Sequence, residues 1–342
     1  PDWCISRQRV WGVPLPIFVS RKTGEPLRDP DVIENIAKIY EKEGADCWFD
    51  NDPQRFLGKK YKKADYIQST DICEVWFDSG STHSFVLEKR KDLAWPASMY
   101  LEGSDQHRGW FHSSLLESCG TRGKAPFKSI LSHGFVVDGK GLKMSKSTGN
   151  IIAPEDILKK YGADILRAWV AASDYAEDLR LDYSILEQHA ESYRKIRNTF
   201  RFLLGNLKDQ KIKFDPNSKE IDKWPELERF MLHQIFTLNK NFKTYFKEYN
   251  FHKLYRELLN FCSLDLSAFY FDIRKDILYC DEIKSTQRQI CTNLLSLFLD
   301  ILLKWFAPIL SFTTEEIFQI INQNKDSSIH LETFPSIPKK WE

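Results

Sequence analysis

Ser98-Met99-Tyr100-Leu101-Glu102-Gly103-Ser104-Asp105-Gln106-His107-Arg108-Gly109-Trp110-Phe111 is the stretch that decides the fold class. Its first half is typical of a buried strand that ends at Gly103, and its second half opens a helix. Ser104 is the expected N-cap of that helix, and Gly120 is its expected C-terminal stop. In open α/β sheets, ligands bind where strands end and helices begin. We therefore expect an α/β fold with a binding site at this strand end.

Short apolar runs alternate with Gly, Pro, Ser and Asp up to about residue 175, as in mixed α/β structure. Tyr66–Ile67 and Val75–Phe77 are predicted strand pieces. Phe135–Val137 runs into Asp138-Gly139, a dipeptide typical of a tight hairpin turn with positive φ. Pro154 suits the first turn of a further helix.

Beyond residue 184 the chain consists of long segments in which apolar residues recur at helical spacing, with few Gly or Pro. The spacing i, i+3, i+4, i+7 recurs and predicts helices. The expected helices span residues 185–207, 227–249, 252–271, 286–306 and 313–322. They predict a helical bundle, with an exposed polar connector at residues 209–223 and a tail at residues 326–342. The fold class is therefore α/β followed by all-α.

Composition limits the classes of function. The chain has 342 residues, which suggests about two domains. Its 42% apolar and 28% charged residues exclude wholesale disorder, a collagen-like repeat and a membrane bundle. With 49 basic and 48 acidic residues the net charge is +1, so any RNA site must be local. No apolar run is long enough for a membrane span, and we expect no membrane partner.

The seven cysteines are widely spaced, and no two form a Cys-x-x-Cys pair. That spacing argues against a zinc ribbon and a disulfide scaffold, and we expect no metal site in the chain. A reducing, cytoplasmic location fits this cysteine usage best. The chain opens on Pro1 rather than Met, which indicates a fragment of a longer protein.

The segment Lys140–Asn150 carries the strongest chemical signal. Three lysines stand at every third position in a loop flanked by glycines, and Ser145, Ser147 and Thr148 add hydroxyl groups. Such a loop can close over a triphosphate and neutralise charge as pyrophosphate leaves. Composition alone gives equal weight to an ordinary solvated basic loop.

The literal string Lys143-Met144-Ser145-Lys146-Ser147 shifts that balance, because it matches the second signature of the class I aminoacyl-tRNA synthetases. The resemblance implies that Lys146, with Lys143 as its partner, contacts the ATP phosphates as a catalytic pair. It also implies that Ser145 and Ser147 help to bind ATP. Magnesium is expected to accompany the ATP rather than to sit in a protein cage.

The strand end is the second chemical segment. Glu102, Asp105 and Gln106 place polar groups there, and Gly103 lets the backbone approach a ligand closely. The alternative is an acidic N-cap turn without a ligand. The segment is similar to the one that holds the aminoacyl-adenylate in isoleucyl-tRNA synthetases. That resemblance implies that Glu102 contacts the adenylate and that Asp105 and Gln106 contact its ribose.

Two further segments resemble the same family. Asp2–Gly12 is similar to the point where the chain re-enters the catalytic domain after the editing insertion, in both the valine and the isoleucine enzymes. Val75–His83 is similar to the next block, which lines the amino-acid pocket. Trp76 is the expected wall of that pocket, with an ordinary core tryptophan as an equal alternative. The Leu101–Phe111 segment favours isoleucine over valine, and the match is bacterial in type.

Three features of the family are missing from the sequence. It has no His-x-Gly-His string, no editing insertion and no cysteine-rich zinc segment, and zinc is expected only in that last segment. The resemblance therefore implies the second half of a Rossmann-like class I catalytic domain plus an α-helical anticodon-binding domain. The expected domains are residues 1–172 with an insertion near 19–70, a connector at 173–184, the helical domain at 185–325 and the tail at 326–342. Alone, the fragment is expected to make adenylate poorly.

The activity that the resemblance implies is isoleucine–tRNA ligation by a monomer. Isoleucine is activated with ATP to isoleucyl-adenylate and is then transferred to tRNA(Ile). A valyl-type synthetase and a non-catalytic tRNA-binding module are the alternatives. Arg194, Arg197 and Arg201 share one helix face at i, i+3 and i+7, and they are candidates for contacts with tRNA phosphates. An ordinary solvated face has equal weight for these arginines.

Overall fold

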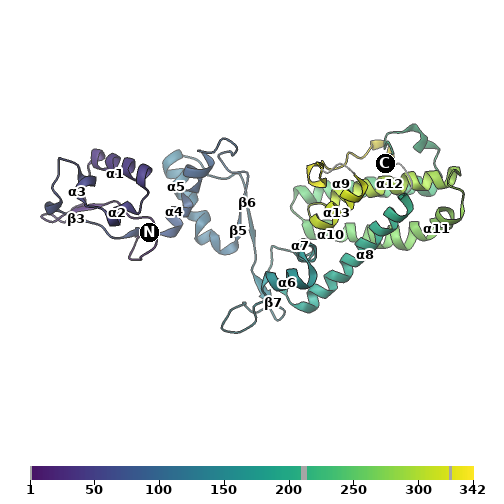
Figure 1. The fold of residues 1–342 in the computed structure, drawn as a ribbon, viewed down its shortest axis with the longest axis horizontal. Coiled ribbons are helices and arrows are strands. Elements are labelled where there is room, and N and C mark those ends of the chain that lie inside the picture. Colours follow the sequence, from purple (N-terminus) through teal and green to yellow (C-terminus); the bar gives the residue numbers. More distant parts are fainter. Residues whose placement is uncertain (1, 209–213, 323–325) are drawn as a thin grey trace. The chain divides into compact units, whose positions relative to one another are not determined.

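The computed structural model describes residues 2–208, 214–322 and 326–342 (Figure 1). The chain divides into two compact units, Pro1–His133 and Gly134–Glu342. The division falls inside the predicted catalytic region, which runs to residue 172. Units of packing and predicted functional domains therefore do not coincide, and the functional boundaries stay predictions.

The first unit begins with a small subdomain that contains two antiparallel strand pairs. β1 (Ser6–Arg7) pairs with β4 (Ile72–Cys73), and β2 (Phe18–Ser20) pairs with β3 (Tyr66–Gln68). The helices between β2 and β3 are α1 (Pro30–Glu43), α2 (Cys47–Asp50) and α3 (Gln54–Leu57). Their apolar faces share a core around the buried side chains of Phe18, Trp48 and Phe56.

The rest of the first unit contains a parallel strand pair. β5 (Tyr100–Gly103) and β6 (Ile130–His133) pair in the register Tyr100↔Ile130 to Gly103↔His133. α5 (Trp110–Arg122) lies between them in the chain, as a connection between parallel strands requires. α4 (Val75–Gly80) packs against α5. The predicted strand that ends at Gly103 is confirmed, but its predicted burial is not, because Leu101 and Glu102 are exposed.

The prediction of a strand at Val75–Phe77 was wrong, because these residues open α4. The carboxylate of Glu74 accepts a hydrogen bond from the backbone N–H of Trp76 at 2.8 Å. That bond satisfies a donor at the first turn of the helix and fixes the helix start.

Both predicted ends of the helix after β5 were also wrong. Ser104 does not cap α5, because a 3-10 turn, η3 (Ser104–Arg108), comes first. Gly120 lies inside α5, which ends at Arg122 and is capped by Gly123 with a φ of 65°. The left-handed conformation at Gly123 is the usual glycine stop, three residues later than predicted.

The second unit opens with a parallel pair, β7 (Val136–Asp138) and β8 (Leu179–Leu181). α6 (Pro154–Tyr161) and α7 (Ala163–Ala172) lie between them in the chain, and Pro154 stands in the first turn of α6 as predicted. The predicted tight turn at Asp138-Gly139 is present, because the backbone N–H of Gly141 donates to the backbone oxygen of Asp138 at 2.8 Å and an antiparallel bridge joins Val137 to Lys143. It does not open a hairpin of two full strands, because β7 pairs in parallel with β8. The positive φ belongs to Gly141, at 84°, rather than to Gly139.

Long helices fill the rest of the second unit (Figure 1). They are α8 (Tyr183–Leu207), α9 (Glu226–Lys247), α10 (Phe251–Asn260), α11 (Phe271–Cys280), α12 (Thr286–Phe306) and α13 (Ser311–Ile321). The predicted helix at 252–271 was too short, because a π-helical segment, η5 (Phe261–Tyr270), joins α10 to α11. The other predicted helices agree to within a few residues, and the fold class of α/β followed by all-α is confirmed.

α12 is the core helix of the bundle. Among the described residues it alone is long and apolar enough to cross a membrane by length and composition, with a mean hydropathy of 1.3. However, 72% of that stretch is buried. Leu294, Phe298 and Leu302 are fully buried in the bundle core, where α12 packs against α8, α9 and α11. The apolar character of α12 is therefore explained by packing inside the bundle.

The two polar segments are less exposed than predicted. Residues 209–213 of the predicted connector lie outside the described residues, whereas Ile221 is buried in the bundle core beside Trp224. In the tail, Ile329 and Trp341 are buried in the same core. Both segments therefore contribute to the packing of the bundle.

Candidate functional site

Glu102, Gly103, Asp105 and Gln106 lie together at the carboxyl end of β5 and in the turn that follows it. Glu102 and Asp105 are exposed, and Gln106 is half-buried. Gln106 Nε2 donates a hydrogen bond to Asp105 Oδ2 (3.2 Å), and Gln106 Oε1 accepts one from the backbone N–H of Trp110 (2.9 Å). Gln106 thus connects the Asp105 carboxylate to the first turn of α5. This turn presents two exposed carboxylates and an amide at the position where parallel sheets bind ligands.

A glycine at position 103 is explained by the lack of room for a side chain and not by its backbone conformation. Its φ of −63° and ψ of 156° are accessible to any residue. A Cβ atom at this position would lie only 2.6 Å from Asp105 Oδ1. The missing side chain therefore makes room for the Asp105 carboxylate.

Trp76 lies beside this turn, on α4. Its side chain is 43% exposed, which sets it apart from an ordinary core tryptophan. Ring atoms Cε2 and Cζ2 of Trp76 lie 3.0 Å from the place where Gly109 would carry a Cβ. The indole therefore offers an open apolar face next to the residues that follow β5.

Trp110 has a packing role. Its ring stacks on Tyr100 with a centroid distance of 4.3 Å and an interplanar angle of 11°. Its Nε1–H donates to the backbone oxygen of Ser79 at 2.9 Å. Trp110 thus holds β5 and α4 against α5. His107 is exposed and meets the ring of Phe111 edge-on.

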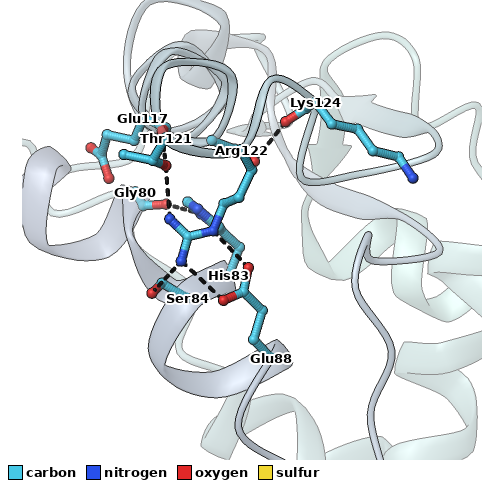
Figure 2. A network of polar contacts seen from close by, with 9 residues as sticks. Gly80, His83, Ser84, Glu88, Glu117, Thr121, Arg122 and Lys124 are labelled. Atoms are coloured by element: carbon cyan, nitrogen blue, oxygen red, sulfur yellow. Dashed lines mark hydrogen bonds and ion pairs between the residues drawn. The ribbon is translucent and has the colours of Figure 1, made fainter.

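A polar network joins α5 to the π-helical turn η2 (His83–Leu87) and to Glu88, the residue that follows it (Figure 2). Arg122 Nε donates to Glu88 Oε1 (2.7 Å), and Arg122 Nη2 donates to Glu88 Oε2 (2.9 Å) and Ser84 Oγ (2.8 Å). His83 Nδ1 lies 3.0 Å from the backbone oxygen of Gly80. The network fixes the last turn of α5 against the segment that follows α4.

Glu117 belongs to the same region but takes no part in that pairing (Figure 2). Both of its carboxyl oxygens are buried and find no hydrogen-bond partner among the described residues. Loss of hydration, and then the charge of Asp78, raises the pKa of Glu117 to about 7. Its Oε1 atom would lie 2.5 Å from a Cβ on Gly80. The sequence carries no signal for this group, because its burial results from the packing of α4 on α5.

The loop with the Lys-Met-Ser-Lys-Ser string exposes both of its lysines. Lys143 and Lys146 make no ion pair with the described residues of the second unit. Ser145 Oγ lies 2.7 Å from Thr148 Oγ1 and 3.1 Å from Ser147 Oγ. The hydroxyl groups therefore bond to one another, whereas the two ammonium groups are available to an anion.

Two of the three candidate arginines on α8 are paired within the bundle. Arg194 donates to Glu191 and lies 3.4 Å from Glu187 Oε1. Arg197 Nη1 donates to the hydroxyl of Tyr193 at 2.9 Å, and its Nη2 lies 3.5 Å from Glu316 Oε2 on α13. These contacts favour a structural role for the first two arginines, because their charges already have partners.

Arg201, the third arginine, lies in a different environment. It lines a hollow of about 450 Å³ together with Lys208, Arg288 and Tyr279. Tyr279 is 63% exposed. This hollow combines cationic side chains with an accessible aromatic ring, the combination that proteins use to bind unpaired nucleotides.

In the part of the chain that the structure describes, no three His, Cys, Asp or Glu side chains gather in a way that could hold a metal ion.

Comparisons with known proteins match two family models, one after the other along the chain. A family model described as "tRNA synthetases class I (I, L, M and V)" matches residues 1–182. A second, described as "Anticodon-binding domain of tRNA ligase", matches residues 228–342.

Among curated relatives, an isoleucine–tRNA ligase of Pelagibacter ubique (strain HTCC1062) is 72% identical over 342 residues, which cover 100% of this chain and 38% of that protein. An isoleucine–tRNA ligase of Mesorhizobium japonicum is 48% identical over 343 residues and is covered to 34%. The chain therefore spans little more than a third of the length of these relatives.

Solved structures share the fold. The AgnB2 LeuRS of Agrobacterium radiobacter K84, in a ternary complex with tRNA and LeuAMS, has a TM-score of 0.73 at 20% identity. That match covers 100% of this chain and 43% of the other chain. The methionyl-tRNA synthetase of Mycobacterium tuberculosis, in complex with methionyl-adenylate, has a TM-score of 0.62 at 19% identity, with 76% and 52% covered.

Proposed function

Because the chain belongs to the class I tRNA synthetases of the I, L, M and V group, we propose that it carries part of an isoleucine–tRNA ligase. The observation that carries the proposal is the 72% identity to an isoleucine–tRNA ligase across the whole chain. The reaction has two steps. Isoleucine is activated with ATP to isoleucyl-adenylate, and the aminoacyl group is then transferred to tRNA(Ile).

In the first step the isoleucine carboxylate attacks the α-phosphate of ATP and pyrophosphate leaves. The carboxylate is already ionised at neutral pH, so no general base is needed. Catalysis then consists of positioning and of stabilising charge on the phosphates. Lys143 and Lys146, which are exposed and make no ion pair with the described residues of their unit, are suited to that task, with Ser145 and Ser147 as further ATP contacts. Magnesium enters with the nucleotide as part of the substrate.

The strand end supplies the other roles. Glu102 contacts the adenylate, and Asp105 with Gln106 binds the ribose hydroxyls, for which exposed carboxylate and amide groups are suitable acceptors and donors. The half-exposed ring of Trp76 forms an apolar wall for the isoleucine side chain. In the second step the terminal ribose hydroxyl of the tRNA attacks the carbonyl carbon of the adenylate, and AMP leaves.

The helical bundle contacts the tRNA in this proposal. The hollow at Arg201 is the better supported contact, because Arg194 and Arg197 are engaged with side chains of the bundle. The enzyme acts as a monomer in the cytoplasm, and the zinc of the family belongs to a segment other than this chain.

The test uses a full-length chimera in which this chain replaces the matched 342 residues of the Pelagibacter ubique relative. We expect ATP–pyrophosphate exchange that depends on isoleucine, with valine a much poorer substrate. The isolated chain should show little exchange. Exchange that prefers valine would assign a valyl-type enzyme, and a chimera that binds tRNA but never exchanges pyrophosphate would assign a binding module.

A pair of lysine variants tests the loop. Lys146→Ala should lower the kcat of exchange roughly 10²-fold or more, as the loss of one charge-stabilising donor does in other enzymes. Lys140→Ala is the matched control, since it removes a lysine from the same loop but outside the string. Equal losses in the two variants would contradict a specific role for Lys146.

A further inference from the structure

The amide side chain of Asn150 makes four hydrogen bonds at the loop that carries Lys143 and Lys146. Asn150 Oδ1 accepts hydrogen bonds from the backbone N–H of Ser145 (2.9 Å) and from Thr148 Oγ1 (2.6 Å). Asn150 Nδ2 donates to Asp138 Oδ2 (2.9 Å) and to the backbone oxygen of Lys143 (3.2 Å). The amide oxygen thus faces two donors and the amide nitrogen faces two acceptors, which fixes the orientation of the amide group.

Asp138 provides the fixed end of this connection. Its Oδ1 atom accepts hydrogen bonds from the backbone N–H groups of Lys140 (3.0 Å) and Leu142 (2.8 Å). Its own N–H donates to the backbone oxygen of Leu142 at 2.9 Å. The bond from Asn150, and then that from Leu142, lowers the pKa of the Asp138 carboxyl. The carboxylate therefore stays ionised as an acceptor.

The base of the loop is held by tertiary structure. Asp138 ends β7, where it stands in register with Leu181 of β8. The next residue of the chain, Asp182, caps α8 by accepting a hydrogen bond from the N–H of Ile185 at 2.8 Å. A Cβ on Gly139 would come within 2.1 Å of Asp182 Oδ2, so the loop base and the start of α8 are packed without space between them.

We propose that Asn150 and Asp138 form a latch that holds Lys143 and Lys146 in the arrangement needed for adenylate formation, with Asn150 as a positioning residue. This inference rests on the proposed function. The physical reason is pre-organisation. An exposed loop samples many shapes, and each lysine would have to be ordered anew when ATP binds. Four bonds from one side chain remove much of that freedom beforehand.

The latch can be broken and then restored by exchanging its two partners. Asn150→Asp removes both donated bonds and sets two carboxylates against each other. Asp138→Asn sets two amide groups against each other. In the double variant, an amide at 138 donates to a carboxylate at 150, and each residue keeps its acceptor for the backbone N–H groups. The bond from position 150 to the backbone oxygen of Lys143 is not restored, because a carboxylate has no donor.

Each single variant, made in the chimera, should lower the kcat of isoleucine-dependent pyrophosphate exchange by about 10- to 100-fold, the scale of a misplacement near 1 Å. The KM for isoleucine should change little. The double variant should recover part of the loss, because it restores the bond between positions 138 and 150. Transfer from preformed isoleucyl-adenylate to tRNA should be retained in all three, because no pyrophosphate leaves in that step. Asn250→Asp is the matched control, since the Asn250 amide also donates to a carboxylate, that of Glu248, and should leave exchange intact.

Cleavage by trypsin tests the latch independently of the proposed function, because it does not depend on enzymatic activity. Trypsin cleaves after exposed lysines, and cleavage after Lys143 and Lys146 should be faster in both single variants and slow again in the double variant. If the parent chimera shows no exchange, the proposed function fails while this measurement still tests the latch. Unchanged exchange and cleavage in the single variants would overturn the latch. A double variant no better than the worse single variant, or equal losses in the transfer step, would overturn it as well.

Discussion

Substituting one glycine by alanine at the strand end should damage the proposed reaction without unfolding the protein. In Gly103→Ala, the new methyl group would lie 2.6 Å from Asp105 Oδ1, whereas ordinary contact begins at 3.4 Å. The carboxylate must therefore move by about 0.8 Å. It is the end of a flexible side chain, so it can turn away, but it then loses the position set by its bond from Gln106.

The stability of the fold should change little. The backbone angles at Gly103 suit alanine, and replacing glycine there lowers the entropy of the unfolded chain by the equivalent of about 0.4–1 kcal/mol. The loss of one exposed hydrogen bond between Asp105 and Gln106 offsets this by a similar amount. A displacement near 1 Å at a reacting centre, in contrast, costs up to about 10²-fold in rate, which corresponds to about 2.7 kcal/mol of barrier.

The assay is isoleucine-dependent pyrophosphate exchange by the chimera, together with the midpoint of urea unfolding. Gly120→Ala is the matched control. Gly120 lies within α5, and nothing is within 4 Å of its added Cβ. This control should gain up to about 1 kcal/mol of stability and keep full activity. If Gly103→Ala exchanges pyrophosphate within about twofold of the parent, the position of Asp105 has no bearing on the reaction.

Three further substitutions test the packing that supports these sites. Glu228→Gln removes the carboxylate that receives two hydrogen bonds from Arg274 (2.6 and 3.0 Å) in the bundle; the free energy of unfolding should fall by about 3–5 kcal/mol, seen as a lower urea midpoint at constant m-value. Asp164→Ala removes the side chain that accepts bonds from the N–H (2.7 Å) and hydroxyl (2.6 Å) of Thr313 at the start of α13; a loss of about 2 kcal/mol should appear in the same measurement. Glu117→Gln should stabilise the protein only at higher pH. The folded-state pKa of Glu117 is raised to about 7, so its ionised form is disfavoured: the penalty is absent below the usual value of 4.5, grows between 4.5 and 7, and is complete above 7. The shift corresponds to about 3.4 kcal/mol, which solvent screening reduces to about 1–2; urea midpoints should therefore agree at pH 4 and favour the variant at pH 8.

The long helices of the second unit could be predicted because their cause is local. Apolar side chains repeat with the helical period along α8, α9 and α12, and few glycines or prolines interrupt them. The strand predicted at Val75–Phe77 failed for the opposite reason. Three apolar residues are too few to show a period, and the helix is favoured by the cap from Glu74 and by packing on α5.

The spacing of charged residues on α8 contains more information than the prediction of a tRNA contact used. The spacing that aligns Arg194 with Arg197 also places Glu191 three residues before Arg194, a distance at which helical side chains pair. Counting the acids on the same face would have indicated that Arg194 is paired. The pairing of Arg197 could not be found in this way, because Glu316 comes from α13.

In the candidate site, too, contacts between neighbours in the chain could be predicted and contacts between distant residues could not. Glu102, Gly103, Asp105 and Gln106 are neighbours in the chain, so their meeting at one turn follows from the sequence itself. The contact between Asn150 and Asp138 in the latch could not be predicted from the sequence. Asp138-Gly139 does form a tight turn, but the strand that pairs with β7 is the distant β8, and Asn150 bonds back to Asp138 across the whole loop. Nothing in either residue type demands that contact. It follows from the pairing of β7 with β8, which fixes the end of β7 and leaves its aspartate facing the loop. Candidate catalytic side chains can thus be identified from a short motif, whereas the groups that hold them in place depend on long-range pairing.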